Sequence, residues 1–218
     1  MQSYTEENYL KIIYHLSVIS NPVQTNAIAE RIQTKAASVT DMLKKLADKA
    51  LVDYTKYQGV NLTQKGKLAA INIVRRHRLW EVFLVEKLNF KWDEVHDVAE
   101  ELEHIKSNLL VERLDEFLDF PKVDPHGDPI PDKDGNFESL GFVKINQLKD
   151  NESGTIMGVS EHSTAFLKHL EKLGLILGKT IKLIEISAFD SSAELLVDQQ
   201  YINISKELAK HILIKKLV

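Results

Sequence analysis

The side chains best suited to bind a metal ion in this chain of 218 residues lie between positions 77 and 104. His77 and Glu81 are four residues apart in a run without proline or glycine, so on a helix they share one face. Carboxylate oxygens and neutral imidazole nitrogens together suit a divalent first-row metal ion. The spacing therefore makes the middle of the chain a candidate metal-binding region.

A second run without proline or glycine repeats this arrangement. Four of its side chains occupy helical positions i, i+4, i+7 and i+8, which predicts one stripe carrying two imidazoles and two carboxylates. These are His96, Glu100, Glu103 and His104. Buried carboxylates must be neutralised by protons, cations or a metal ion. The alternative is a solvated surface laced with salt bridges to nearby arginines and lysines, and spacing alone favours that alternative.

The composition favours two or three modest domains, with 44% hydrophobic residues to supply their cores. The chain has no cysteine, so it can form neither a disulfide nor a thiolate metal site. The N-terminus lacks the pattern of a signal peptide, and no apolar run reaches the roughly 20 residues needed to cross a bilayer. We expect a soluble, cytoplasmic protein without a membrane partner.

The charge is distributed unevenly along the chain. The net charge is −4, made up of +2 over residues 1–65, −7 over residues 66–140 and +1 over residues 141–218. This balance argues against a wholly basic nucleic-acid coat. An acidic middle between nearly neutral ends is instead what a cation-binding segment between other modules would produce.

Residues 1–65 have the pattern of a winged helix-turn-helix. Apolar positions at helical spacing predict helices over residues 5–19, 26–32 and 36–50, followed by two short strands that end by residue 63. A short helix, a tight turn and a longer helix with small polar residues at its start outline a helix-turn-helix, and the hairpin would be its wing. A three-helix unit without a DNA function is the alternative, which the hairpin makes weaker.

In this interpretation the third helix meets DNA. Small polar side chains at its start are expected to face base edges, while lysines meet phosphates. The predicted DNA-binding residues are Lys35, Ala37, Ser38, Thr40, Asp41, Lys44, Lys45 and Lys56. The small basic excess predicts that affinity depends on dimerisation.

The rest of the chain is predicted to form two further domains and a linker. Residues 66–120 should be helical, with more apolar surface than two helices can bury against each other, which favours a dimer interface. Residues 121–141 are rich in proline and glycine and form the predicted linker. Residues 142–218 contain short predicted strands and one helix near residues 163–173, which together suggest a small β-barrel. The predicted fold is mainly α with small β parts.

Taken in this order, the segments resemble the metal-dependent transcriptional repressors of the diphtheria-toxin-repressor and manganese-transport-regulator family. The motifs that carry the resemblance are Thr5-Glu6-Glu7-Asn8-Tyr9-Leu10, Ala36-Ala37-Ser38-Val39-Thr40, Arg76-His77-Arg78-Leu79-Trp80-Glu81, Val95-His96-Asp97, Glu103-His104 and the linker Asp124-Pro125-His126-Gly127-Asp128-Pro129-Ile130-Pro131. They cover all three segments in the family's order. The resemblance implies that the C-terminal domain is SH3-like, and it favours a metal site over a solvated surface.

The resemblance also implies a function and a set of ligands. It implies a homodimer that binds double-stranded operator DNA when loaded with Fe²⁺ or Mn²⁺, represses metal-uptake genes and has no small-molecule substrate. Carried over by position, the primary metal site would be Asn8, Glu100, Glu103 and His104. A second site would draw on His77, Glu81 and His96, with Asp124, His126 and Glu161 as further candidate ligands.

The departures from the family's pattern bear on the metal. Glu100 stands where iron-responsive members have a cysteine, Asn8 where they have a methionine, and Asp124 where the linker often has a cysteine. Oxygen in place of sulfur favours the harder Mn²⁺ over Fe²⁺. Lys11 replaces a carboxylate of the two-domain manganese regulators, which argues against their two-metal cluster.

Two alternatives come from other classes of protein. Glu101-Leu102-Glu103-His104 contains one Glu-x-x-His motif, but a di-metal enzyme built on a four-helix bundle needs two, so we expect no enzyme. An SH3-like domain could also bind peptides. The aromatic side chains for such a groove are few, namely Phe166, Phe189 and Tyr201.

Overall fold

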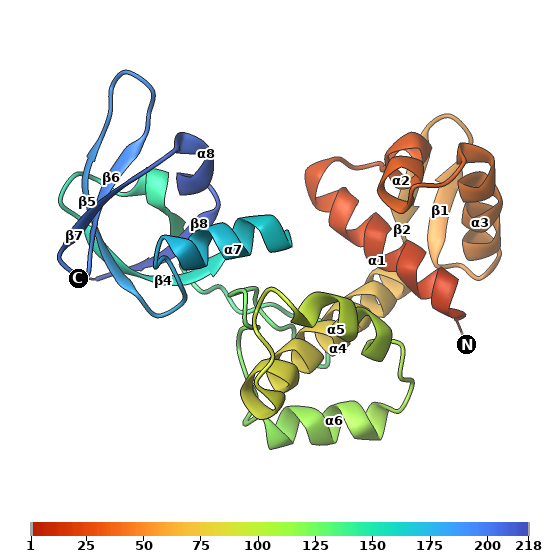
Figure 1. Cartoon of the computed structure of the whole chain (residues 1–218). Coiled ribbons are helices and arrows are strands. Elements are labelled where there is room, and N and C mark those ends of the chain that lie inside the picture. The colour runs from red at the N-terminus through yellow and green to blue at the C-terminus, as the bar shows by residue number, and fades with distance from the viewer. Residues whose placement is uncertain (1, 218) are drawn as a thin grey trace. The chain divides into compact units, whose positions relative to one another are not determined.

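The computed structural model describes residues 2–217, which divide into two compact units (Figure 1). The first unit consists of Met1–His77, Glu100–Asn108 and Pro131–Phe137. The second consists of Arg78–Ala99, Leu109–Ile130 and Glu138–Val218. Each unit is thus assembled from segments far apart in the sequence.

The first unit contains the predicted winged helix-turn-helix. Its elements are α1 (Tyr4–Ile19), α2 (Thr25–Ile32), α3 (Ala36–Asp48) and the antiparallel hairpin of β1 (Val52–Thr55) and β2 (Gly59–Leu62). Ser3 caps α1 and forms a capping box with Glu6, so the helix begins slightly earlier than the sequence predicts. Gln33 takes a left-handed conformation that ends α2 and makes the tight turn before α3.

An apolar core holds these helices together. Leu10 and Ile13 of α1, Ile28 of α2 and Leu43 of α3 are fully buried in one cluster, which Val60 of the wing joins. Fully burying such a side chain stabilises a fold by roughly 1.5–3 kcal/mol. The inner face of α3 is therefore committed to the core, and its outer face remains exposed.

The long helix α4 (Gln64–Leu88) is followed by α5 (Val95–Leu102) and α6 (Asn108–Phe117). The prediction of one continuous helical stripe over residues 96–104 is therefore wrong. The helix ends at Leu102, so Glu103 and His104 lie in the turn that follows it. A new helix begins after Ser107, a residue type that favours helix starts.

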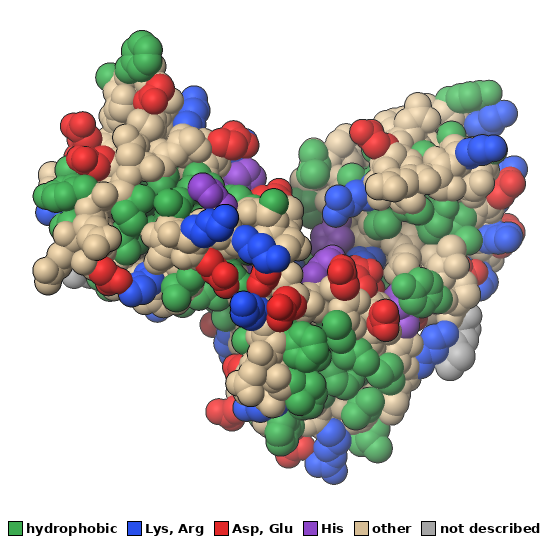
Figure 2. Space-filling model, viewed as in Figure 1, with side chains coloured by type: hydrophobic (Ala, Val, Ile, Leu, Met, Phe, Trp, Pro, Cys, Tyr) green, Lys and Arg blue, Asp and Glu red, His purple; other side chains and the backbone are tan. Residues whose placement is uncertain are grey.

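The helices of the second unit leave much apolar surface uncovered. Leu79 and Val82 of α4 pack with Val111 and Leu114 of α6 in a small core. Several large apolar side chains nearby remain exposed, namely Leu88, Leu109, Leu110, Phe117 and Phe120. Figure 2 shows hydrophobic side chains gathered over the region of α6. This surface agrees with the predicted excess of apolar residues in the helical segment.

The C-terminal part forms a six-stranded antiparallel sheet, which confirms the predicted small β domain. The strand order is β3-β8-β4-β5-β6-β7. The strands are β3 (Val143–Lys144), β4 (Ser153–Val159), β5 (Thr180–Ile186), β6 (Ala193–Val197), β7 (Gln200–Ile204) and β8 (Ile212–Lys216), with a 3₁₀ turn η1 (Ile145–Gln147), α7 (Thr164–Lys172) and the short α8 (Lys206–Ala209). The sequence prediction missed β3, β8 and α8, which are short or end in charged residues.

The linker between α6 and β3 contains a tight turn that packs on the sheet. An isolated bridge joins Val123 to Pro129, and the Val159 amide of β4 donates a hydrogen bond of 2.7 Å to the His126 carbonyl. Gly127 has φ +86°, and a Cβ there would lie 2.1 Å from the Met157 carbonyl oxygen. Glycine is required at this position because only it permits both the backbone angle and the close approach. None of the helices described is long and apolar enough to span a membrane.

Candidate metal centres

The first candidate centre lies in the first unit and has Glu103 in its middle. We call it the Glu103 cluster; it consists of Glu7, Asn8, Lys11, His77, Glu100, Glu103 and His104. Helix α1 contributes the first three residues, α4 contributes His77, and α5 and the turn after it contribute the others. The cluster thus joins the first helix of the DNA-binding part to the segment around residue 100.

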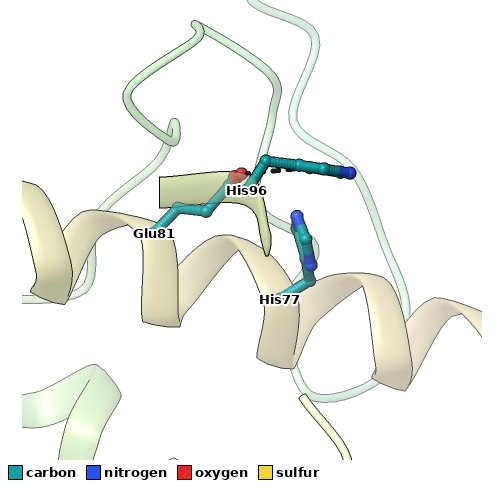
Figure 3. Close-up of side chains that lie close together, drawn as sticks. All are labelled: His77, Glu81 and His96. Atoms are coloured by element: carbon teal, nitrogen blue, oxygen red, sulfur yellow. Dashed lines mark ion pairs between the residues drawn. The ribbon is translucent and has the colours of Figure 1, made fainter. Parts of the chain in front are cut away.

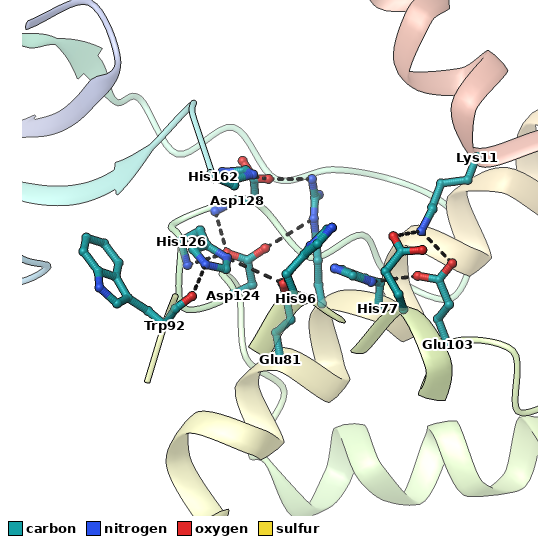
Figure 4. Close-up of polar contacts among 12 residues, drawn as sticks. Lys11, His77, Glu81, Trp92, His96, Glu103, Asp124, His126, Asp128 and His162 are labelled. Carbon is teal, nitrogen blue, oxygen red and sulfur yellow. Dashed lines mark hydrogen bonds and ion pairs between the residues drawn. The ribbon is translucent and has the colours of Figure 1, made fainter. Parts of the chain in front are cut away.

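Glu103 is fully buried and paired on both sides (Figure 4). Its Oε2 lies 2.7 Å from His77 Nδ1, and its Oε1 accepts a hydrogen bond of 2.6 Å from Lys11 Nζ. Lys11 Nζ also donates to Glu100 Oε1. A buried carboxylate needs such partners, because burial of a charge without compensation costs several kcal/mol.

His104 is held in an orientation that suits metal binding. Its Nδ1 lies 2.6 Å from Glu7 Oε2, so the neutral ring places its hydrogen on Nδ1 and its lone pair on Nε2. Nε2 is buried, makes no hydrogen bond among the described residues and lies 3.5 Å from Glu103 Oε1. A carboxylate behind an imidazole in this way is the usual arrangement around a metal-binding histidine.

Asn8 supplies a second buried polar atom without a hydrogen bond. Its Oδ1 is shielded from solvent and has no hydrogen-bond partner within the described part of the chain. Unsatisfied buried oxygens are costly, so each calls for an explanation such as a bound ion. With the carboxylates of Glu100 and Glu103, Asn8 Oδ1 and His104 Nε2 would make an oxygen-rich donor set of the kind that suits a divalent first-row cation. The ligand atoms of Glu100 and Glu103 also lie within 4.8 Å of one on His77.

The second candidate centre lies in the second unit. We call it the Asp124 cluster; it consists of Glu81, His96, Asp124 and His126. Glu81, Asp124 and His126 are all buried, and each offers a ligand atom within 4.8 Å of the others. Glu81 Oε1 lies 3.7 Å from both His96 Nδ1 and His126 Nδ1. Figure 3 shows Glu81 and His96 approaching each other, with His77 one turn earlier on α4.

The linker turn fixes the geometry of the Asp124 cluster. Asp124 Oδ1 accepts hydrogen bonds from the backbone amides of His126 and Asp128, at 2.8 and 3.0 Å. His126 Nε2 donates a hydrogen bond of 2.7 Å to the Trp92 carbonyl, and its Nδ1 faces Glu81, where it carries a hydrogen in the charged ring and would offer a lone pair once that proton is displaced. The Arg78 guanidinium lies 3.5 Å from Asp124 Oδ2 and donates to Asp128 Oδ2 and to the Pro129 carbonyl.

Burial and neighbouring charges shift two pKa values in this cluster. Burial raises the pKa of Asp124 to about 7, with further contributions from Glu81 and Asp128. Burial alone would lower the pKa of His126, but the Glu81 and Asp124 carboxylates outweigh it and raise the pKa to about 9. The metal-free cluster therefore retains protons that a metal ion would replace.

Two predicted ligands of the second site, His77 and Glu161, also have contacts outside the Asp124 cluster. His77 belongs to two groups of ligand residues within the described part of the chain: one with Glu81 and His96, and one with Glu100 and Glu103, where its Nδ1 lies 2.7 Å from Glu103 Oε2. Glu161 lies just before α7, where its Oε1 accepts a hydrogen bond from the Ser163 amide, and it joins none of the ligand groups among the described residues. The neighbouring His162 lies against His126 instead, with ring centroids 4.9 Å apart. The ligand roles of His77 and Glu161 stay predictions.

Sequence reasoning also missed two members of the Glu103 cluster as participants. The sequence motif assigns Glu7 no role, yet its side chain orients His104 and lies 3.5 Å from Arg76. Lys11 replaces a carboxylate of the two-domain manganese regulators, but its sequence position does not predict its two partners. Their spacing gave a signal, because Glu7, Asn8 and Lys11 share one face of α1 at positions i, i+1 and i+4.

The predicted DNA-binding residues lie on the outer face of α3 and on the wing. All but Thr40 are exposed, and Thr40 is half-buried, with its hydroxyl donating to the Ala36 carbonyl. Lys44 lies 3.3 Å from Asp41 on the same face. Lys56 lies over the ring of Tyr57, which is 87% exposed at the tip of the wing. These side chains are accessible to a macromolecular partner.

Comparison with known proteins agrees with this architecture segment by segment. The model "Iron dependent repressor, N-terminal DNA binding domain" matches residues 1–60, and "Iron dependent repressor, metal binding and dimerisation domain" matches residues 63–132. A FeoA domain model matches residues 143–216. The three models leave only short connecting segments unmatched.

Individual relatives match over long stretches. The chain is 31% identical over 159 residues to the iron-dependent repressor IdeR of Mycobacterium leprae (strain TN), covering 71% of this chain and 69% of the relative. It is 36% identical over 118 residues to the HTH-type transcriptional regulator MntR of Oceanobacillus iheyensis, covering 54% and 80%. A solved manganese-dependent transcriptional repressor in complex with manganese is 34% identical, with a TM-score of 0.83 over 97% of this chain and 100% of that one.

The fold, the clusters of metal-binding side chains and these matches define a metal-dependent transcriptional repressor rather than an enzyme. It combines a DNA-binding domain, a metal-binding and dimerisation domain, and an SH3-like FeoA domain. The chain belongs to the iron-dependent repressor family, together with regulators of the IdeR, diphtheria-toxin-repressor and MntR kinds.

Proposed function

We propose that this protein is a manganese-activated repressor in which the Glu103 cluster is the switch. Asn8, Glu100, Glu103 and His104 would hold one divalent cation. The observation that carries this proposal is the pair of buried atoms without hydrogen bonds among the described residues, Asn8 Oδ1 and His104 Nε2, of which His104 Nε2 lies 3.5 Å from Glu103 Oε1. When bound, the cation would balance the charge of the two carboxylates and accept lone pairs from Asn8 Oδ1 and His104 Nε2.

Helix α1 connects this site to DNA recognition. Asn8 belongs to α1, whose Leu10 and Ile13 pack in the same core as Leu43 of α3. A ligand on α1 and three ligands in α5 and the turn after it would fix the DNA-binding helices relative to the dimerisation segment. Metal and operator DNA would then be positively coupled, so DNA must tighten metal binding by the same factor as metal tightens DNA binding.

The Asp124 cluster supports a second site with a different role. Glu81, Asp124 and His126 are its proposed ligands, and His162 is a better candidate than Glu161 for a further ligand because its ring lies against His126. His96 approaches Glu81 from the exposed side. Because the linker turn is bonded to β4, metal binding here would stabilise the attachment of the SH3-like domain rather than act on α1.

The ligand types favour Mn²⁺ over Fe²⁺. Oxygen atoms outnumber nitrogen atoms in the Glu103 cluster, and no cysteine is available anywhere in the chain. Hard oxygen ligands suit Mn²⁺, whereas softer ligands favour metals later in the series. The manganese-bound repressor with a TM-score of 0.83 supports the same preference.

Operator binding as a homodimer completes the proposal. The exposed apolar side chains of α6 and its flanks, Leu109, Phe117 and Phe120, offer a surface for a second copy in the segment that matches a dimerisation domain. The outer face of α3 would enter the major groove, with Ser38, Thr40 and Asp41 near base edges and Lys35, Lys44, Lys45 and Lys56 near phosphates. We also propose that the DNA-binding domain ends at residue 65, the helical domain at residue 120 and the linker at residue 141.

A titration of DNA binding tests the metal preference. Chelator-stripped protein would be titrated with Mn²⁺, anaerobic Fe²⁺, Co²⁺ and Zn²⁺ while fluorescence anisotropy follows its binding to the promoter of its own gene. We expect Mn²⁺ to switch on binding at a lower free concentration than Fe²⁺. Activation by Fe²⁺ alone would refute the metal assignment, and metal-independent binding would refute the switch.

A further inference from the structure

Lys11 occupies an unusual position in the Glu103 cluster. The residue is only 8% exposed, although lysine is almost never fully buried without a partner. Its ammonium donates to Glu103 Oε1 at 2.6 Å and also to Glu100 Oε1. One ammonium group thus pairs with two carboxylates, of which Glu103 has no exposed surface.

The same two oxygen atoms are needed for metal binding. A charged lysine has three donors and no acceptor, so Lys11 cannot be a ligand while it is protonated. Asn8 and Lys11 are three residues apart on α1 and therefore face the same side. Helix α1 consequently presents both a free carbonyl oxygen, which attracts a cation, and an ammonium group, which repels one.

We propose that Lys11 is an internal counter-cation that competes with the metal ion for Glu100 and Glu103. This inference rests on the proposed function of the Glu103 cluster. Without metal, the ammonium keeps α1 attached to the carboxylates; a divalent cation must displace it from at least one of them. Lys11 thereby raises the free metal concentration at which the repressor responds, and it leaves room for a single cation.

The side chain is able to make this exchange. Lysine is a compact point charge on a flexible four-carbon stem, so its ammonium can withdraw without a change in the backbone. Glu7 is the carboxylate that α1 contributes to the cluster, and it already pairs with His104 and Arg76. The displaced ammonium therefore cannot take Glu7 as a new partner. Displaced from Glu100 and Glu103, the ammonium would turn towards solvent.

The test compares Mn²⁺ binding by wild type and variants of the full chain, measured by electron paramagnetic resonance of free Mn²⁺. The site of interest is the one that Glu103→Gln removes. We expect Lys11→Gln to bind Mn²⁺ there about tenfold more tightly, because a like charge beside a cation is repulsive. Lys11→Arg keeps the charge and should stay within about threefold of wild type.

A matched control separates the loss of this charge from a general loss of salt bridges. Lys49 also pairs with a carboxylate of α1, at 2.6 Å from Glu6 Oε1, but it lies outside the cluster. Lys49→Gln should therefore leave Mn²⁺ binding unchanged. Thermal unfolding adds a second readout: Mn²⁺ should raise the Tm of Lys11→Gln by more than it raises that of wild type, since tighter binding gives more stabilisation.

The outcomes distinguish this inference from the proposal on which it rests. Equal or weaker Mn²⁺ binding by Lys11→Gln would overturn the role of Lys11. If that variant does not fold without metal, Lys11→Met and wild type can be refolded with Mn²⁺ and their metal release to a chelator timed; release as fast as wild type overturns it as well. If wild type itself has no Mn²⁺ site that depends on Glu103, the proposed function fails instead.

Discussion

The Glu103 cluster and the Asp124 cluster use similar side chains but hold their positive charge differently. Each combines buried carboxylates, imidazoles and one basic side chain. Lys11 in the first is flexible and bonded to the carboxylates themselves, whereas Arg78 in the second is also bonded to the Pro129 carbonyl. Arginine remains charged at all relevant pH values. The first cluster is therefore suited to exchange its lysine ammonium for a metal ion, whereas the second is suited to keep its guanidinium in place.

The central carboxylates of the two clusters, Asp124 and Glu103, also differ in how firmly they are held. Asp124 Oδ1 is bonded to two backbone amides and so stabilises the linker turn itself. The contacts that Glu103 makes with Lys11, His77 and His104 are all with side chains. A site held by movable side chains suits a switch, while a site tied to the backbone suits a structural role.

The largest effect is expected from Glu103→Gln. This change removes the charge of a fully buried carboxylate while keeping its shape, so Mn²⁺ affinity at the first cluster should fall at least about a hundredfold. Metal titration calorimetry would measure this loss. Glu101→Gln changes the exposed neighbour and should behave like wild type. Equal losses in both variants would mean that the effect is one of overall charge.

His126→Ala should have a smaller effect on operator binding than on metal content. It removes one of three proposed ligands and a ring that joins the linker to Trp92, so one metal per chain should be lost. Operator affinity at saturating Mn²⁺ should fall by about tenfold or less, since α1 is untouched. His169→Ala, on the exposed side of α7, is the control. A complete loss of operator binding would make the second cluster the switch.

Proton release should distinguish the two clusters. The raised pKa of His126 means that its imidazole is charged at pH 7 without metal, and a ligand must be neutral, so Mn²⁺ binding must displace this proton. Mn²⁺ affinity of the second cluster should therefore rise as the pH increases from 6 towards 9. Calorimetry of Glu103→Gln in buffers of different ionisation enthalpy would count the protons. If Glu103→Gln/His126→Gln releases the same number of protons on binding Mn²⁺, the protons come from a group other than His126.

The smallest effect is expected at the DNA surface. Lys44→Gln should weaken operator binding several-fold and lower the salt dependence by about one counterion, without changing Mn²⁺ affinity in the absence of DNA. Lys87→Gln removes a charge from the end of α4 and should leave the salt slope unchanged. Anisotropy at several salt concentrations measures both slopes. If the salt dependence of operator binding is unchanged in Lys44→Gln, DNA contacts a surface other than the outer face of α3.

The sequence was sufficient for the fold because each domain had a local signature. Helical periodicity, the short turn at Gln33 and the hairpin after α3 predicted the winged helix-turn-helix. The grouping of ligands was harder, because it depends on where helices end. Spacing placed His96 and His104 on one stripe, but the helix stops at Leu102, and the two histidines belong to different units.

The partners of the ligands could not be predicted from spacing at all. Lys11 is 92 positions from Glu103, and Glu7 is 97 positions from His104. Only the packing of α1 brings them together. The contacts of His77 with Glu103 and of His162 with His126 could not be predicted for the same reason, since each joins segments far apart in the sequence.

Operator binding by Glu103→Gln tests the central claim most directly. Fluorescence anisotropy with promoter DNA would be followed during a Mn²⁺ titration of wild type, Glu103→Gln and Glu101→Gln. We predict that wild type and Glu101→Gln switch on at the same free Mn²⁺ concentration, and that Glu103→Gln stays unbound at concentrations at least about a hundredfold higher. Mn²⁺-dependent binding by Glu103→Gln with an unchanged midpoint would contradict the assignment of the switch to the Glu103 cluster.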